Sequence, residues 1–139
     1  MLWSRRLVSV LVALALAGGC ARKDPGSPEA IADAFADAYF SRADQQRAKQ
    51  FTAFGASKML EEELSQTRAV RGSDFNPSEA NLDVTLVRGE RTTRGERVRF
   101  DYEVRFKGGV EKHADIELTR IDGEWKVVRV GVGDAPATR

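Results

Sequence analysis

The stretch VRFDYEVRF, residues 98–106 of this 139-residue chain, decides its fold. Apolar and charged residues alternate through the whole stretch, from Val98 to Phe106. Because successive side chains of a β-strand point to opposite faces of a sheet, this period of two predicts a strand that is buried on one face only. Such strands are typical of an antiparallel sheet with one face in water.

The next three residues, Lys107-Gly108-Gly109, predict a hairpin loop in which Gly109 takes the left-handed conformation and Phe106 pairs with Val110. A slip of one residue would set apolar side chains against charged ones, so the register of this hairpin is well specified. The predicted opposite pairs are Val98 with Leu118, Phe100 with Ile116, Arg99 with Glu117, Glu103 with His113, and Arg105 with Glu111.

Two further strands are expected. Residues 80–86 alternate in the same way, with Ala80, Leu82, Val84 and Leu86 apolar. Asp122-Gly123 predicts a turn before a last strand over residues 125–132, whose apolar residues 125, 127, 128, 130 and 132 do not fit one face of a regular strand. We therefore expect this strand to be buried on both sides, or nearly so. Trp125 and Val127 then either meet a second copy of the protein or pack under a loop, and both interpretations stay open.

Helices are expected before the strands. Ser27 suits an N-cap and Pro28 the first helical position. The helix that follows has an apolar stripe with Asp33 and Asp37 on its other side. A second short helix capped by Asp44 and a third from about Ser57, whose Glu61 to Glu63 lie on its solvated side, complete an α+β fold. The stripe of the first helix consists of Ile31, Ala34, Phe35, Ala38 and Tyr39.

The first twenty residues have the layout of a secretory signal. Arg5 and Arg6 precede an apolar stretch over residues 7–16, and three small residues lead to Cys20, the one cysteine of the chain. The run Leu16-Ala17-Gly18-Gly19-Cys20 resembles a bacterial lipobox, which implies a diacylglycerol on the Cys20 sulfur and a mature chain that begins at Cys20. A membrane-spanning anchor fits less well, because residues 7–16 make only about half of a span. An ordinary secretory signal and a buried structural cysteine also fit less well.

This resemblance implies an address and a division of the chain. Lipid on Cys20 would hold the protein at a membrane of the cell envelope. Ala21 implies sorting to the outer membrane, facing the periplasm, if the bacterium has two membranes. We expect a signal peptide at 1–19, the lipidated cysteine and a tether at 20–27, one domain at 28–133 and a tail at 134–139.

The charge balance gives no sign of nucleic-acid binding. The chain has 22 basic and 21 acidic residues, and cleavage before Cys20 removes Arg5 and Arg6, which leaves a net charge of −1. With Cys20 acylated, the domain forms no disulfide.

The order of helices and strands, the turn around residues 41–44 and the closing segment at residues 122–128 resemble the nuclear transport factor two superfamily, which includes ketosteroid isomerase-like and SnoaL-like domains. The resemblance implies a cone in which the first helix lies in a curved sheet. It also implies a pocket lined by Phe35, Tyr39, Phe100, Tyr102 and Ile116. Members include isomerases, dehydratases and lipoproteins without known activity, so the fold does not decide the function.

No catalytic residue, metal site or cofactor is expected. His113 lies by parity on the polar face with Glu103 and Asp115, where we favour surface charge pairs over a general base or a metal site. The first hypothesis is a lipid-anchored domain that binds a protein partner or a small apolar ligand without catalysis. The alternatives are an isomerase- or dehydratase-type enzyme, which needs an ionisable residue near Tyr102 or Tyr39, and a structural role through the Trp125 and Val127 face.

Overall fold

The computed structural model describes residues 24–72 and 82–135. The helices come first: α1 (Pro28–Ala36), a π-helical turn η1 (Asp37–Ser41), α2 (Gln45–Lys49) and α3 (Phe54–Arg71). The strands follow: β1 (Val84–Arg94), β2 (Arg97–Phe106), β3 (Glu111–Ile121) and β4 (Glu124–Asp134).

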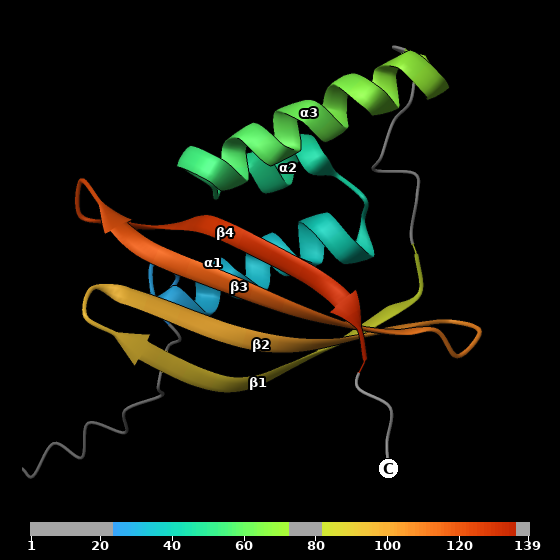
Figure 1. The fold of residues 1–139 in the computed structure, drawn as a ribbon. Coiled ribbons are helices and arrows are strands. Elements are labelled where there is room, and N and C mark those ends of the chain that lie inside the picture. Colours follow the sequence, from blue (N-terminus) through green and yellow to red (C-terminus); the bar gives the residue numbers. More distant parts are fainter. Residues whose placement is uncertain (1–23, 73–81, 136–139) are drawn as a thin grey trace, which may run out of the picture.

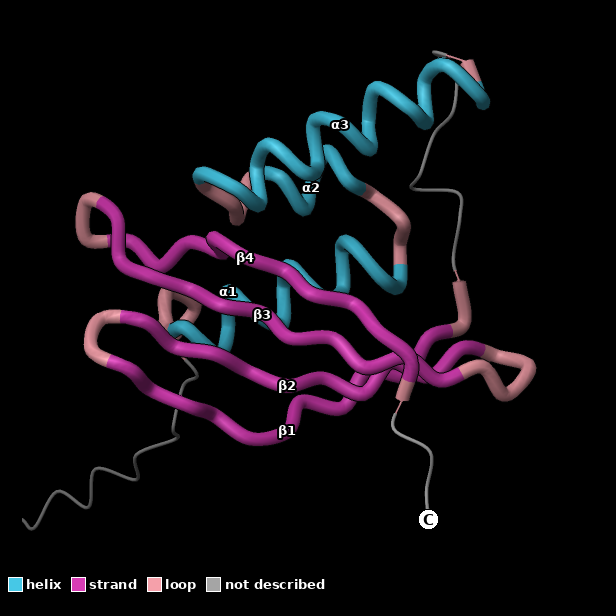
Figure 2. Tube along the Cα trace, viewed as in Figure 1, coloured by secondary structure: helices cyan, strands magenta, loops and turns pink. Residues whose placement is uncertain are grey.

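The four strands form one antiparallel sheet in the order β1-β2-β3-β4. Figure 1 shows α1 lying across one face of this sheet and α3 beside β4. The strands bend and twist together around α1 (Figure 2). The predicted α+β class, with helices packed on a curved antiparallel sheet, is confirmed. We call the face toward α1 the inner face and the opposite one the outer face.

The first two helices begin where the sequence predicts. The Ser27 hydroxyl accepts a hydrogen bond from the Ala30 backbone N–H at 3.1 Å, and the Asp44 carboxylate caps α2 in the same way. The third helix begins at Phe54, earlier than the expected start near Ser57.

The buried stripe of α1 differs from the predicted one. Ala32 and Ala36, which were not part of the expected stripe, are fully buried, while Ile31 and Ala34 are only partly buried. Small side chains at these positions let the helix axis approach the sheet closely. Phe35 is buried as expected.

The β2–β3 hairpin has the predicted register. All five predicted opposite pairs occur, among them Phe100 with Ile116 and Glu103 with His113. The Phe106 N–H donates to the Val110 carbonyl at 2.9 Å, and Gly109 has a φ of 92°.

A β-bulge in β4 changes which side chains face the core. Leu118 pairs with Val127 whereas its neighbour Glu117 pairs with Arg129, so Val128 is one extra residue on β4. The bulge brings the apolar residues on either side of it to the same, inner face, since each pairs with an inner-face residue of β3. The expectation that β4 is buried on both sides is wrong, since Val127 is its one buried residue and the others are partly buried or exposed. The four apolar residues that share the inner face are Trp125, Val127, Val130 and Val132.

A second bulge lies in β1. Arg88 pairs with Tyr102 and Arg91 pairs with Phe100, so β1 has one extra residue between these pairs. Both arginines consequently lie on the inner face, near α1. The strand is also displaced from its predicted range of 80–86: it begins at Val84 and continues to Arg94, while Ala80 is outside the described residues.

Candidate functional site

The residues expected to line a pocket form the core instead. Phe35, Phe100, Tyr102 and Ile116 are each at most 1% exposed. Tyr39 is partly buried, and its ring stacks on Phe35 with 5.6 Å between centroids. The space between α1 and the sheet is thus filled by these side chains, and the expectation that they line an open pocket is corrected.

Tyr102 has a carboxylate partner on α1. Its hydroxyl donates to Asp33 Oδ1 at 2.7 Å, and Arg88 Nη1 donates to Asp33 Oδ2. Burial, and then the hydrogen bond to Asp33, raises the pKa of Tyr102 above its usual range. Asp33 therefore faces the sheet and is not on the far side of α1 from it, contrary to the sequence-based expectation.

Tyr39 has a similar partner on α3. Its hydroxyl donates to Glu63 Oε1 at 2.8 Å. Burial, followed by the hydrogen bond to Glu63, raises the pKa of Tyr39 above its usual range. Glu63 was expected on the solvated side of its helix, so sequence reasoning missed both carboxylates.

These two pairs hold helices in place. A general base needs a carboxylate oxygen directed at a substrate, but one Asp33 oxygen accepts from Tyr102 and the other from Arg88. A second tie forms one turn earlier, where Arg91 pairs with Glu29. The arrangement attaches α1 to β1 and β2.

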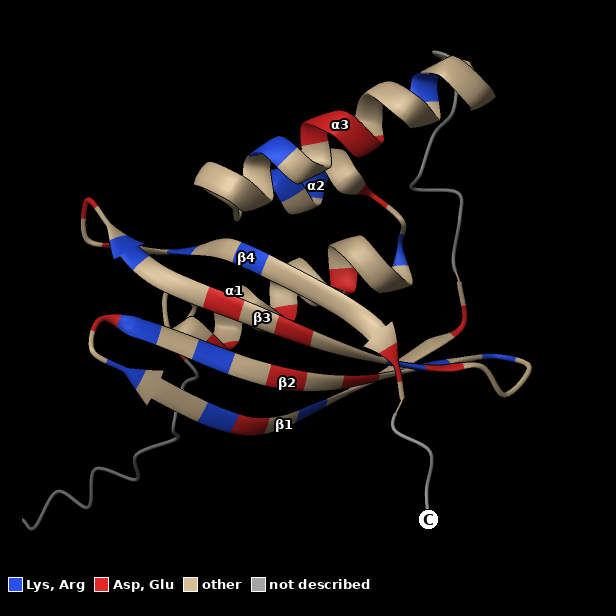
Figure 3. Cartoon of the chain, in the orientation of Figure 1, with Lys and Arg blue, Asp and Glu red and all other residues tan. Residues whose placement is uncertain are grey.

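The outer face carries the charged residues of the hairpin, as predicted. Figure 3 shows charges of both signs along β2 and β3. His113 Nε2 lies 3.6 Å from Asp101 Oδ1, and Arg99 is 3.7 Å from both Asp101 and Asp115. Asp101 and Asp115 are directly opposite each other. Among the described residues, Asp101 Oδ1 is buried and has no hydrogen-bond partner.

His113 lies on this charged surface and not in the cone. Its side chain is 40% exposed. Within residues 24–72 and 82–135, no group of three His, Cys, Asp or Glu side chains is placed to hold a metal ion. In the same ranges no helix is long and apolar enough to cross a membrane.

Val127 is not available to a second copy of the protein. It is fully buried, and its backbone pairs with the segment before α3: its N–H donates to the Phe51 carbonyl at 2.8 Å, and its carbonyl accepts from Ala53 at 2.9 Å. Trp125 is half-buried beneath Arg120, whose guanidinium carbon is 5.3 Å from the ring centroid. For Val127, packing under a loop is therefore the correct interpretation, and an interface role is wrong.

Two adjoining hollows lie at the end of the outer face where the β1–β2 hairpin turns. One has a volume of about 680 Å³ and the other about 480 Å³. Arg94, Arg97 and Arg129 line both of them. Phe54 and Val128 line the larger hollow, and Arg99 the smaller one. Sequence reasoning did not bring these residues together.

No known protein family matches the chain by sequence. No curated protein matches it either.

Solved structures resemble the fold. A protein from Thiobacillus denitrificans, provisionally named a calcium/calmodulin-dependent protein kinase type II association domain, has a TM-score of 0.55 at 14% identity, covering 78% of this chain and 95% of its own. A Campylobacter jejuni protein, provisionally named an NTF2-like transpeptidase, has a TM-score of 0.51 at 15% identity, with 74% and 98% covered. An NTF2-like protein of unknown function from Shewanella baltica has a TM-score of 0.50 at 10% identity, with 78% and 92% covered.

At these identities the likeness concerns the fold and not the activity. It agrees with the element order and with α1 packed in the curved sheet. The described part of the chain therefore has the nuclear transport factor two-like fold.

Proposed function

We propose that the protein is a lipid-anchored domain of the cell envelope that binds a protein partner and carries out no chemistry of its own. Support for the anchor comes from the sequence around Cys20 and from the short tether that follows it. In a bacterium with two membranes, the domain faces the periplasm from the outer membrane.

The filled interior of the cone is the observation that supports a binding function rather than a catalytic one. Phe35, Phe100 and Tyr102 occupy the space that a substrate of an isomerase or dehydratase would need. The same packing leaves no space for a small apolar ligand inside the cone, because closely packed protein interiors have few voids larger than a water molecule. A partner is then bound on the outside of the domain.

The second half of α3 favours a protein partner. Ala56 and Leu60, near its start, are buried, whereas Val70, near its end, is 85% exposed. A groove of about 630 Å³ between α2 and α3 has Leu64 among its lining residues, with polar residues around it. An apolar side chain within a polar groove is a common feature of protein interfaces.

Site-specific photo-crosslinking in cells that produce the full chain tests this proposal. A photoreactive residue at Ser65, beside the groove, is expected to give one defined adduct, and the same residue at Lys107, in the far hairpin, is the matched control. Leu64→Glu should abolish the adduct at position 65. Equal adducts from both positions, or none from position 65, would refute a partner at α3.

A second candidate is an isomerase- or dehydratase-type enzyme, and the hydrogen bond between Tyr102 and Asp33 favours it, since that function needs an ionisable group beside a tyrosine. A catalytic tyrosine must be reachable from solvent. The chain has two tyrosines, so nitration followed by mass spectrometry reports on each. We expect Tyr102 to react only after unfolding in urea. Nitration of Tyr102 in the native protein would favour the enzyme.

A further inference from the structure

The larger hollow on the outer face combines cationic and apolar side chains. It is lined by Arg94 from β1, Arg97 from β2 and Arg129 from β4, and by Phe54 at the start of α3. Arg94 and Arg97 are directly opposite each other in the sheet, where like charges repel. An anion between them would relieve this repulsion.

Two of these arginines, Arg94 and Arg129, have no ion pair among the described residues, although Arg129 lies directly opposite Glu117 in the sheet. Arg97 is paired with Glu117 at 2.9 Å. Arg94 and Arg129 form no ion pair or side-chain hydrogen bond with any residue in the described parts of the chain. Glu96 is the one acidic side chain that lines the larger hollow. Guanidinium groups suit the oxygens of phosphate, which they bind through paired hydrogen bonds.

Phe54 adds an exposed apolar group beside these charges. It is 72% exposed, an unusual state for a phenylalanine, and its φ of 54° lies in the left-handed region that a bulky residue rarely adopts. The tertiary structure thus holds a large aromatic ring in water at the edge of an arginine cluster. Aromatic and cationic side chains together are typical of surfaces that lie at a membrane interface.

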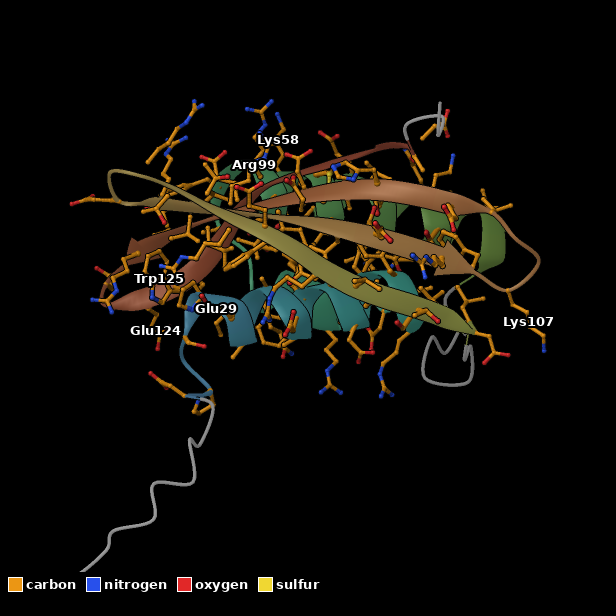
Figure 4. The ribbon with its side chains drawn as sticks, turned by 90° about the horizontal axis from the view of Figure 1, so that it is seen from below. Glu29, Lys58, Arg99, Lys107, Glu124 and Trp125 are labelled. Carbon is orange, nitrogen blue, oxygen red and sulfur yellow. The ribbon has the colours of Figure 1, made fainter. Side chains whose placement is uncertain are left out.

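The position of this surface in the molecule fits a membrane. Figure 4 shows Glu29, in the first turn of α1, at the same end as Glu124 and Trp125, with Lys107 at the opposite end. In Figure 1, α3 begins beside the β3–β4 hairpin, also at this end. Residues 21–27 are all that separate Cys20 from α1, and an extended chain of that length reaches at most about 25 Å.

We propose that Arg94, Arg97, Arg129 and Phe54, which we call the arginine face, contact an anionic phospholipid bilayer. Arg94 and Arg129 bind lipid phosphates, and Phe54 enters the headgroup region. This inference rests on the proposed lipid anchor, which brings the arginine face within reach of the bilayer. The result is a fixed orientation in which the hairpin at Lys107 points away from the membrane.

Fluorescence quenching in vesicles tests the orientation with the full chain, produced with its lipid. Because Cys20 carries the lipid, a second cysteine is the one free thiol for a fluorescent label. The label is placed at Glu96→Cys, beside the arginine face, or at Val110→Cys, in the far hairpin. The vesicles contain either phosphatidylglycerol or phosphatidylcholine, each with a quencher on the acyl chains.

The expected result is quenching of the label at position 96 in phosphatidylglycerol vesicles, with little in phosphatidylcholine and none at position 110. Each basic residue near an anionic surface changes the contact equilibrium about fivefold. The double substitution Arg94→Gln and Arg129→Gln, made in the Glu96→Cys chain, should therefore lower the equilibrium constant for this contact about twenty-fivefold. Arg105→Gln with Lys107→Gln, which removes the same charge at the far end, should leave it unchanged.

Flotation of the vesicles separates the two proposals. A chain that floats with both kinds of vesicle but shows equal quenching at positions 96 and 110 overturns the orientation and leaves the anchor standing. The orientation is also overturned if the Arg105→Gln and Lys107→Gln chain loses as much quenching as the Arg94→Gln and Arg129→Gln chain. A chain that does not float with phosphatidylcholine vesicles overturns the anchor, and the orientation with it.

Discussion

Tyr102 donates a hydrogen bond of 2.7 Å to Asp33, which joins β2 to α1 across 69 positions of the sequence. Tyr102 is 1% exposed, so its hydroxyl depends on this partner. The other oxygen of Asp33 accepts from Arg88 in β1. One carboxylate thus connects three elements of the fold, and α1 is held in the curved sheet by polar contacts as well as by its apolar stripe.

Removing either partner of this hydrogen bond should show how much the bond contributes to the free energy of unfolding. Tyr102→Phe loses the hydroxyl alone and should lower the free energy of unfolding by about 1 kcal/mol. Asp33→Ala leaves a buried hydroxyl without its partner and should cost more, about 1–3 kcal/mol. Urea unfolding measures both. If Asp33→Ala is no less stable than Tyr102→Phe, the hydrogen bond does not carry this role.

Alkaline pH should destabilise the protein through its tyrosines. The pKa of Tyr102 is raised in the folded state, so above the unfolded value of about 10 the unfolded chain loses a proton that the folded protein keeps. Stability is fully present below that pH and falls as the pH rises, by about 1.4 kcal/mol per pH unit for this group. Tyr102→Phe should show a shallower fall between about pH 10 and 11.5 in urea titrations. Parallel curves for the two proteins would contradict a raised pKa.

The hairpin of β2 and β3, with its register, could be predicted from the sequence, whereas for β4 the strand could be predicted but not the faces of its residues. In β2 every second residue is apolar, so a single register satisfies both faces. In β4 one extra residue, Val128, reverses the parity, and a regular strand pattern applied to 125–132 then gives the wrong faces. The misfit of the apolar residues 125–132 to one face marks an irregularity, but burial on both sides accounts for it equally well, because Val128 is itself apolar.

Leu118 and Val132 both lie on the inner face, but their different burial predicts different contributions to stability. Leu118 is fully buried opposite Val127, so Leu118→Ala should cost about 2–5 kcal/mol. Val132 has the same inner-face parity but is 52% exposed, and Val132→Ala should change stability by less than about 0.5 kcal/mol. Thermal and urea unfolding compare the two variants. Similar losses of stability in the two variants would mean that the Val132 side chain is more deeply buried than the structure shows.

The outer face predicts a stabilising substitution. Asp101 and Asp115 are directly opposite each other, an unfavourable arrangement for like charges, and a buried oxygen of Asp101 is without a hydrogen-bond partner among the described residues. Asp101→Asn removes this repulsion. It also weakens the contacts of Asp101 with Arg99 and His113, but both of these side chains are at least 40% exposed, where an ion pair contributes little, and Arg99 keeps its contact with Asp115. We expect a gain of about 0.2–1 kcal/mol in the free energy of unfolding. A loss of stability would show that the pair is held favourably by its neighbours.

The polar contacts of Asp33 with the sheet could not be predicted from the sequence either. Helical periodicity placed Asp33 opposite the apolar stripe, but the buried stripe includes Ala32 and Ala36, which brings Asp33 to the edge of the sheet. Arg88 reaches it only because β1 is bulged. Such contacts depend on how two elements dock, which the pattern within one element does not contain.

Lipid attachment at Cys20 is the central claim, and intact mass tests it most directly. The full chain and a Cys20→Ser variant are expressed in the same bacterial host, and membrane and soluble fractions are analysed. The account predicts a membrane-bound product that begins at Cys20 and carries the added mass of a diacylglycerol and its acyl chains, with both features lost in the variant. An unmodified product, or one that stays at the membrane without Cys20, would contradict it.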